Sequence, residues 1–208
     1  MSGVSAFEDH ADRYETWFEK NPLAYQSELL AIRALLPKGK ALEVGVGSGL
    51  FAAPLGIKYG VDPSRAMRDR ARERGITVVR GVAEALPFAG AEFEAALMVT
   101  TVCFLDDIDT AFYEAFRVLK PGGSFLVAFI DKKSLIGRSY ELRKDQSVFY
   151  KDATFYAVPD LLSHLARAGF RDFDFRQTLF GPVSEMLAPD PIREGHGEGS
   201  FVVIKALK

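Results

Sequence analysis

Short apolar runs alternate with amphipathic segments along most of the chain. Apolar, partly β-branched runs of this length predict strands, here residues 41–45, 57–61, 77–80, 93–99, 124–130, 173–179 and 200–207. Helical spacing of apolar residues predicts helices at 64–74, 108–119 and 159–168. Strands joined by single helices favour parallel pairing with right-handed crossovers. We therefore predict an α/β fold with a doubly wound, mostly parallel seven-stranded sheet.

Three regions depart from this alternation. Residues 7–36 are amphipathic and helical with a break at Asn21-Pro22, because proline can open a second helix. Residues 132–158 are polar and aromatic, with a weak helical pattern at 135–144. A loop rich in proline and glycine separates the last two predicted strands, which favours antiparallel pairing of the final strand.

We expect one domain over residues 1–208. Its N-terminal part, 5–36, is expected to form a helical cap, and insertions near 132–158 and 181–199 are expected to form the substrate region. These segments decorate the carboxyl edge of the predicted sheet, where loops carry specificity while the sheet stays generic.

Composition narrows the classes of partner. A chain of 208 residues with 48% hydrophobic residues can bury a full core, and its net charge of −2 gives no basic excess for nucleic acid or an anionic membrane. The single cysteine, Cys103, suits a reducing compartment, and no signal pattern appears. The histidines have no metal-ligand spacing, so no metal site is expected: His10, His164 and His196. We expect a cytoplasmic protein that binds neither nucleic acid nor membrane.

A glycine turn follows the first predicted strand. The glycines Gly45, Gly47 and Gly49 stand at alternate positions, and an apolar segment at 50–55 predicts a helix directly after them. Glycine allows positive φ and close approach of a ligand to the backbone, and the free N–H groups of a helix start can face that ligand. The spacing differs from the dinucleotide pattern G-x-G-x-x-G. A nucleotide-like ligand is the first hypothesis, beside a glycine turn that binds nothing.

Asp62 is the second chemical clue, at the end of the second predicted strand. It follows the glycine turn at close to the interval of about 20 residues that separates such a turn from a ribose-binding acid in βαβ units. A carboxylate there can accept hydrogen bonds from two ribose hydroxyls. The alternative is a capping or turn residue before Pro63 and the next helix.

Four segments together resemble the class I S-adenosylmethionine-dependent methyltransferases, in the group that acts mainly on small molecules (methyltransferase type 11-like). They are LEVGVGSG at 42–49, GVDPS at 60–64, GVAEALPF at 81–88 and RVLKPGG at 117–123. The likeness covers about residues 5–180. It implies a Rossmann-like methyltransferase fold with an antiparallel last strand.

The resemblance implies S-adenosylmethionine as cofactor and S-adenosylhomocysteine as product. Glu43 and the glycines Gly45, Gly47 and Gly49 match the segment that holds the methionine end, where the acid helps to hold the ammonium group. Asp62 matches the acid on the ribose hydroxyls.

The other matched positions surround the adenine and the sulfonium. Pro63 would border the adenine. The family usually has an acid where this chain has Val82, so the adenine amino contact must be absent or pass to Ala83 or Glu84. The segment beside the sulfonium is matched by Val99, Thr100 and Thr101.

Few catalytic side chains are expected, because the sulfonium is already an activated methyl donor and the protein mainly positions the nucleophile and excludes water. The candidates for a general base are Tyr14, His10 and Asp106. Tyr14 also fits a family pattern in which a tyrosine of the N-terminal helix covers the cofactor, although its apolar stripe could be plain core.

We expect methyl transfer to an N, O, C or S atom of a small-molecule acceptor, by a monomer or homodimer. A cofactor-binding sensor or accessory protein without transferase activity is the alternative. A nicotinamide-dependent oxidoreductase is disfavoured by the glycine spacing and by the absence of a second nucleotide-binding half.

Overall fold

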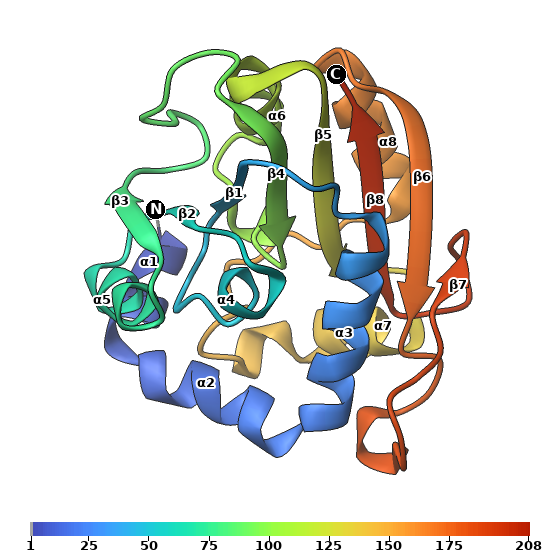
Figure 1. Cartoon of the computed structure of the whole chain (residues 1–208). Helices are drawn as coiled ribbons and strands as arrows, with labels where there is room; N and C mark the ends of the chain where they lie inside the picture. Colours follow the sequence, from blue (N-terminus) through green and yellow to red (C-terminus); the bar gives the residue numbers. More distant parts are fainter. Residues whose placement is uncertain (1) are drawn as a thin grey trace.

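The computed structural model describes residues 2–208, with side chains from residue 6 onward, and its central feature is one mixed sheet (Figure 1). Its eight strands lie in the order β3-β2-β1-β4-β5-β8-β6-β7. The strands are β1 (Ala41–Val44), β2 (Tyr59–Asp62), β3 (Thr77–Arg80), β4 (Phe93–Val99), β5 (Leu119–Ile130), β6 (Arg171–Thr178), β7 (Arg193–Glu194) and β8 (Phe201–Leu207). Strands β1 to β5 pair in parallel, and β8 runs antiparallel between β5 and β6. The predicted α/β class and antiparallel last strand are confirmed.

The sheet has one strand more than the seven predicted. β7 pairs antiparallel with β6 through Arg193 and Glu194, inside the segment 181–199 that was expected to be a loop. Two residues are too few to display an alternating pattern. The side-chain amide of Gln177 adds a hydrogen bond of 3.2 Å to the Glu194 carbonyl, so a contact across the fold fixes this strand.

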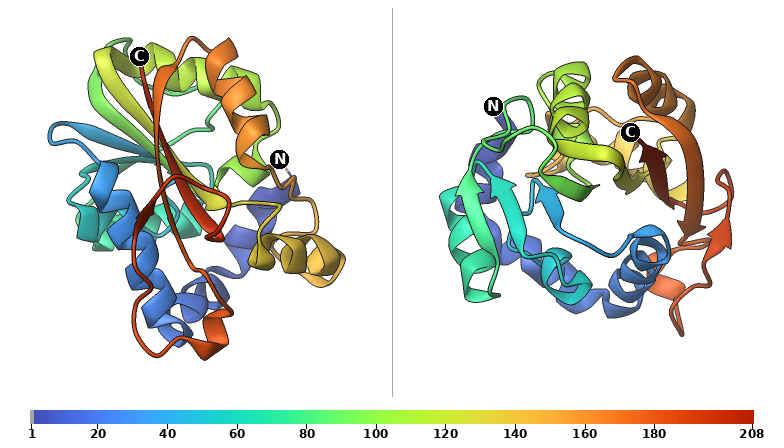
Figure 2. Two further views of the ribbon diagram at one scale, coloured as in Figure 1. Left: turned by 90° about the vertical axis from the view of Figure 1, so that its right-hand side faces the viewer. Right: turned by 45° about the horizontal axis from the view of Figure 1, so that its top comes forward.

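Helices lie on both faces of the sheet and beyond its carboxyl edge (Figure 1, Figure 2). They are α1 (Ser2–Asp9), α2 (Ala11–Lys20), α3 (Pro22–Leu35), α4 (Ala52–Leu55), α5 (Arg65–Glu73), α6 (Ile108–Val118), α7 (Leu135–Arg143) and α8 (Val158–Arg167). Figure 2 shows α6 and α8 on one face and α3, α4 and α5 on the other. The helix expected at 50–55 is only the four residues of α4, because residues 50 and 51 belong to the preceding turn; it ends as expected at Leu55, before Gly56 in a left-handed conformation.

The N-terminal segment forms three helices where two were expected. Pro22 opens α3, as predicted from the Asn21-Pro22 pair. A further break lies at His10, whose φ of −129° is not helical. The turn there lets α1 pack beside α5, where Glu8 accepts hydrogen bonds from the Ser64 hydroxyl and the Arg65 amide, both 2.7 Å.

Strand β5 begins at Leu119, directly where α6 ends and five residues earlier than its apolar run at 124–130. The PGG segment at 121–123 lies inside this strand, where the register with β4 shifts. Gly122 has a φ of +76°, which suits an irregular strand entry.

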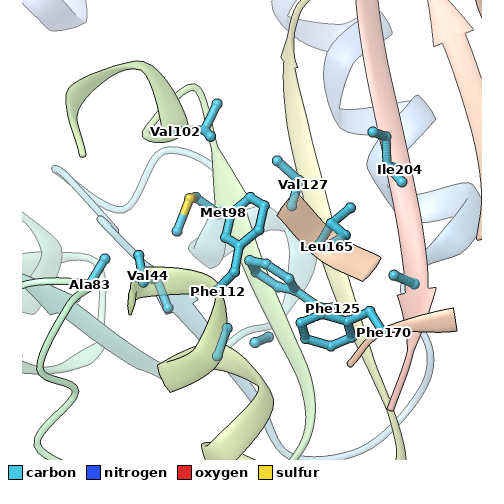
Figure 3. Close-up of a cluster of buried hydrophobic side chains, with 14 of the residues drawn as sticks. Val44, Ala83, Met98, Val102, Phe112, Phe125, Val127, Leu165, Phe170 and Ile204 are labelled. Atoms are coloured by element: carbon cyan, nitrogen blue, oxygen red, sulfur yellow. The ribbon is translucent and has the colours of Figure 1, made fainter. Parts of the chain in front are cut away.

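Aromatic side chains fill the core between the sheet and helices α6 and α8 (Figure 3). Phe125 of β5 is fully buried; its ring centroid lies 5.3 Å from those of Phe112 on α6 and Phe170. Burial of each such ring contributes about 2–3 kcal/mol to the free energy of unfolding. This rigid core leaves the carboxyl edge of the sheet free for loops.

No helix within residues 2–208 is long and apolar enough to cross a membrane. The same described part of the chain contains no group of three or more acidic, histidine or cysteine side chains that could hold a metal ion.

Candidate functional site

A cavity of about 480 Å³ lies at the carboxyl ends of β1, β2 and β4, the edge where open α/β sheets bind ligands. Figure 1 shows α2 and α7 beyond this edge, on the side to which the arrow of β4 points. Side chains of α2, α3 and α7 line the cavity together with the loops after the strands. The N-terminal helices therefore roof a site whose floor is the sheet edge.

The glycine turn forms part of that floor. Gly45 and Gly47 line the cavity, with φ values of +70° and +53°. A Cβ on Gly45 would lie 2.4 Å from the Thr101 side chain, whereas a Cβ on Gly47 would meet nothing within 4 Å. Gly49 does not line the cavity; a Cβ there would lie 2.5 Å from the Ile76 side chain. The bare backbone at Gly47 leaves room that a ligand can occupy.

Asp62 ends β2 and is 7% exposed. Its Oδ2 accepts a hydrogen bond of 2.8 Å from the Gly47 amide, and its Oδ1 accepts one of 2.9 Å from the Ser64 amide. Burial raises the pKa of Asp62, and these two hydrogen bonds oppose the rise. Ser64, not Asp62, caps α5, through a bond from the Met67 amide. A carboxylate has acceptor capacity beyond two hydrogen bonds, so Asp62 can also accept from diol hydroxyls in the cavity.

Glu43 lies in the middle of β1, between Gly60 of β2 and Leu97 of β4, and is 1% exposed. Its Oε2 is buried without a hydrogen-bond partner among the described residues. Burial raises its pKa well above the ordinary value, and the nearby Asp62 charge adds to the rise, although the Ala52 amide opposes it. Glu43 does not line the cavity, so it can reach a ligand there only through an intervening group such as water.

The remaining predicted cofactor positions also meet in the cavity, which is lined by Tyr14, Pro63, Ala83, Glu84, Val99 and Thr100. Thr100 has a φ of +48°, uncommon for a residue with a Cβ, and its amide donates to the Ala128 carbonyl. The Oε1 atom of Glu84 accepts hydrogen bonds from the amides of Asp106 and Asp107. Much of its bonding capacity is thus used in holding the loop after β4.

The three candidates for a general base lie in different surroundings. Tyr14 is in the cavity, and its ring also contacts Phe7 and Phe18, with centroids 5.7 and 5.1 Å away, so the site and the aromatic stripe share it. Burial raises the pKa of Tyr14 far above the ordinary value, so it stays protonated at neutral pH. Asp106 lines the cavity but is exposed. His10 is exposed and is not one of the lining residues.

Ion pairs fix α2 over the glycine turn. Arg74 donates to the Ser48 carbonyl and to Glu15, both at 2.9 Å. Arg70 pairs with Glu15 at 2.8 Å and also with Asp12. These contacts join the roof to α5 and to the turn itself, and so position Tyr14 in the cavity.

Sequence reasoning missed Glu28 of α3. Glu28 lines the cavity, is 4% exposed, and burial raises its pKa to about 8. A signal was present: the buried residues of α3 follow one helical stripe, Ala24, Ser27, Glu28, Ala31, Ile32 and Leu35. A glutamate inside an apolar stripe is rarely fully buried unless another group pairs with it.

Comparisons with known proteins agree with this geometry. A family model described as a methyltransferase domain matches residues 42–127. An uncharacterised protein of Methanocaldococcus jannaschii is 40% identical over 205 residues, which cover 99% of this chain and 100% of the relative. A malonyl-(acyl-carrier protein) O-methyltransferase of Geobacter sulfurreducens is 30% identical, over 81% of this chain and 70% of its own.

A solved structure extends the likeness to the whole chain. It is a crystal structure of an S-adenosylmethionine-dependent methyltransferase from Thermotoga maritima, described as a possible histamine N-methyltransferase. The two chains are 48% identical and superpose with a TM-score of 0.97 over 98% of this chain and 99% of the other. Motifs, fold and relatives therefore agree, and the chain belongs to the class I S-adenosylmethionine-dependent methyltransferases.

Proposed function

We propose that this enzyme transfers a methyl group to a small-molecule acceptor that binds in the cavity beside the cofactor. The observation that carries the proposal is the cavity of about 480 Å³, which runs from Gly47 and Asp62 to aromatic side chains of α2 and α7. A partly enclosed hollow of this size under a helical roof suits a small ligand better than a protein or nucleic-acid surface.

The cofactor end of the cavity fits S-adenosylmethionine. In this proposal Asp62 holds the ribose hydroxyls, and the bare backbone at Gly45 and Gly47 lets the methionine end lie along the turn. The unpaired Oε2 atom of Glu43 provides an acceptor for the ammonium group through water. In support, Asp62 keeps acceptor capacity beyond its two hydrogen bonds, and a Cβ on Gly47 would meet nothing within 4 Å.

The adenine and the sulfonium would lie against the outer walls of the same region. Pro63 and the backbone at Ala83 border the adenine in this proposal, while Val99 and Thr100 flank the sulfur. When bound, S-adenosylmethionine supplies a methyl group that the positive charge on its sulfur has already activated. The chain is left to orient the acceptor and to exclude water.

The N-terminal cap and the substrate-region insertions carry acceptor specificity in this proposal. Tyr14 and Trp17 of α2, and Tyr140 of α7, line the cavity from these segments, and Val183 lines it from the segment before β7. The Thermotoga maritima structure, described as a possible histamine N-methyltransferase, supports including histamine among the acceptors tested.

Methyl transfer from isotope-labelled S-adenosylmethionine to an acceptor panel tests this proposal. The panel holds histamine, arylalkyl amines, catechols, small carboxylic acids and thiols, and S-adenosylhomocysteine binding is measured by calorimetry in parallel. Asp62→Ala should weaken S-adenosylhomocysteine binding by about 10-fold to 100-fold, the scale for losing charge-assisted hydrogen bonds. Asp69→Ala removes an exposed carboxylate on α5 and serves as the matched control. Cofactor binding without turnover on any acceptor would favour the sensor alternative.

A further inference from the structure

Glu28 is the buried charged group that the proposed cofactor site leaves unexplained. It lies on α3 and lines the cavity, and burial alone raises its pKa, with no hydrogen bond or ion pair from another described residue to oppose the rise. A charged carboxylate in such a place is costly unless a ligand or a proton compensates its charge. A group that the ligand provides is the natural partner.

The surroundings of Glu28 are aromatic. Tyr14, Trp17, Tyr140 and Tyr150 line the same cavity, and the rings of Tyr140 and Tyr150 stack with centroids 5.2 Å apart. Aromatic faces attract cations through the negative face of the ring. A carboxylate among aromatic faces is a combination that selects a positively charged ligand.

Charge elsewhere in the cavity points the same way. Asp62 and Glu84 also line it, so its inner walls carry acidic groups. The two arginines that line it, Arg13 and Arg143, are exposed, where water solvates them. An anionic group placed deep in the cavity would be repelled by Glu28, whereas an ammonium group would neutralise it.

Glu28 belongs to a different wall from the cofactor residues. Its helix α3 packs against β6 and β8, and the neighbouring Ser27 hydroxyl accepts a hydrogen bond of 2.9 Å from the Asp190 amide. Gly47 and Asp62 instead lie at β1 and β2. Glu28 thus lines the cavity from α3, whereas Gly47 and Asp62 line it from the edge of the sheet.

We propose that Glu28 is the acceptor-binding residue of this enzyme and that the acceptor is an amine, which enters as an ammonium ion between Glu28 and the aromatic side chains. This inference rests on the proposed methyltransferase function. The acceptor nitrogen gives one proton to the Glu28 carboxylate and gains the methyl group, whose carbon–sulfur bond breaks with its electron pair left on sulfur. The proton passes to water when the methylated ammonium product leaves.

The titration of Glu28 makes this binding depend on pH. The titratable groups whose pKa the Glu28 charge raises are tyrosines of three segments: Tyr14 on α2, Tyr25 on α3, and Tyr140 and Tyr150 on and after α7. Burial raises the pKa of each, so they remain neutral near pH 8. Burial also raises the pKa of Glu28 to about 8, so amine affinity should increase as the pH rises toward that value.

Calorimetric titration of paired ligands into the S-adenosylhomocysteine complex tests the inference. The pairs are phenethylamine with 2-phenylethanol, tryptamine with tryptophol, and butylamine with butanol. At least one amine should bind about tenfold or more tightly than its alcohol, and Glu28→Gln should remove that preference. Glu19→Gln, an exposed acid on α2, is the control.

Three results would overturn the inference. The first is that no amine binds better than its alcohol. The second is that Glu28→Gln keeps the preference for amines. The third is that Glu28→Gln weakens S-adenosylhomocysteine binding about tenfold or more, which would assign Glu28 to the cofactor. Methyl transfer to a neutral acceptor alone would keep the proposed function and reject the amine, whereas absence of S-adenosylhomocysteine binding by the folded native chain would reject the proposed function.

Once a substrate is known, kinetics can distinguish direct contact between Glu28 and the acceptor from a purely structural role of Glu28. Glu28→Gln should raise KM for an amine and flatten the rise of kcat/KM between about pH 6 and pH 8, because the titrating carboxylate is gone. Glu28→Asp retains the charge on a shorter side chain and should restore part of the pH dependence. A purely structural role for Glu28 would lower activity equally at all pH values.

Discussion

The two ends of the cavity are built in different ways. The end near β1 and β2 is formed by backbone and by one acid that the backbone holds. Gly45 and Gly47 line it without side chains, and Asp62 accepts hydrogen bonds from two amides. At the end near α3 and α7, side chains from distant segments meet, among them Glu28 and Tyr140. A cofactor common to many enzymes can be recognised by a short backbone turn, while an individual acceptor needs side chains that suit its own chemistry.

Substitution at the glycine turn should give the largest effect. Gly45→Ala places a Cβ 2.4 Å from Thr101 and in a left-handed conformation, so we expect a loss of about 3 kcal/mol in the free energy of unfolding. Gly47→Ala is the matched control, because its Cβ meets nothing within 4 Å. Only the left-handed backbone conformation should then lower the free energy of unfolding, by about 1 kcal/mol. Urea denaturation measures both. Equal losses would contradict the close packing described at Gly45.

Glu28 should make stability depend on pH. Its ordinary pKa is 4.5 and burial raises it to about 8, so between these values the folded protein binds more protons than the unfolded chain. The free energy of unfolding therefore falls as the pH rises through this window. Glu28→Gln should be more stable than the native protein at pH 9 and about equal to it at pH 4.

Urea denaturation of the Glu28→Gln and Glu19→Gln variants at several pH values measures that difference. The exposed Glu19 should give none. A stability difference for Glu28→Gln that does not change with pH would show that Glu28 has the same pKa in the folded and unfolded protein, so that burial does not raise it.

Asp62→Asn tests whether the cofactor end depends on one carboxylate. We expect S-adenosylhomocysteine binding to weaken by about 1–2 kcal/mol, because the amide keeps the shape but loses the charge and part of the acceptor capacity. Calorimetry measures the change, and circular dichroism checks that the fold persists. Unchanged affinity would remove Asp62 from the cofactor site.

The ion pairs that hold the roof should give the smallest effects. Asp12→Ala removes an exposed partner of Arg70 and should change stability by less than about 0.5 kcal/mol. Glu15→Gln affects both Arg70 and Arg74, and we expect it to weaken S-adenosylhomocysteine binding about twofold to fivefold by loosening α2 over the turn. If Asp12→Ala weakened S-adenosylhomocysteine binding more than Glu15→Gln, Glu15 would not be the main anchor of α2.

The sequence predicts the end of the cavity near β1 and β2 better than the end near α3 and α7, because the first is built from local motifs and the second from distant segments. The glycine turn and Asp62 are defined by local residue types after two strands, and topology alone brings adjacent parallel strand ends together. Their roles toward the cofactor remain predictions, but their meeting in one cavity was foreseeable. The aromatic residues at 132–158 were noticed as a group, although nothing local shows that Tyr140 and Tyr150 stack beside α3.

Glu28 shows what the sequence could not provide. Its helix was predicted, and its place in the apolar stripe of α3 is visible, but a single glutamate there could also lie at the edge of the buried face. Its helix packs against β6, β8 and the segment around Asp190, which are remote in sequence. The short strand β7 and the break at His10 were not predicted for a similar reason, because contacts between separate segments define them.

The central claim is that the cavity has separate ends for the cofactor and for an amine acceptor. The most direct test titrates S-adenosylhomocysteine into the native protein, Asp62→Asn and Glu28→Gln, and then titrates phenethylamine and the other paired ligands into the complexes. We expect Asp62→Asn to weaken S-adenosylhomocysteine binding about tenfold, and Glu28→Gln to leave it within about twofold while removing the preference for amines. Equal weakening of S-adenosylhomocysteine binding by the two substitutions would contradict the claim.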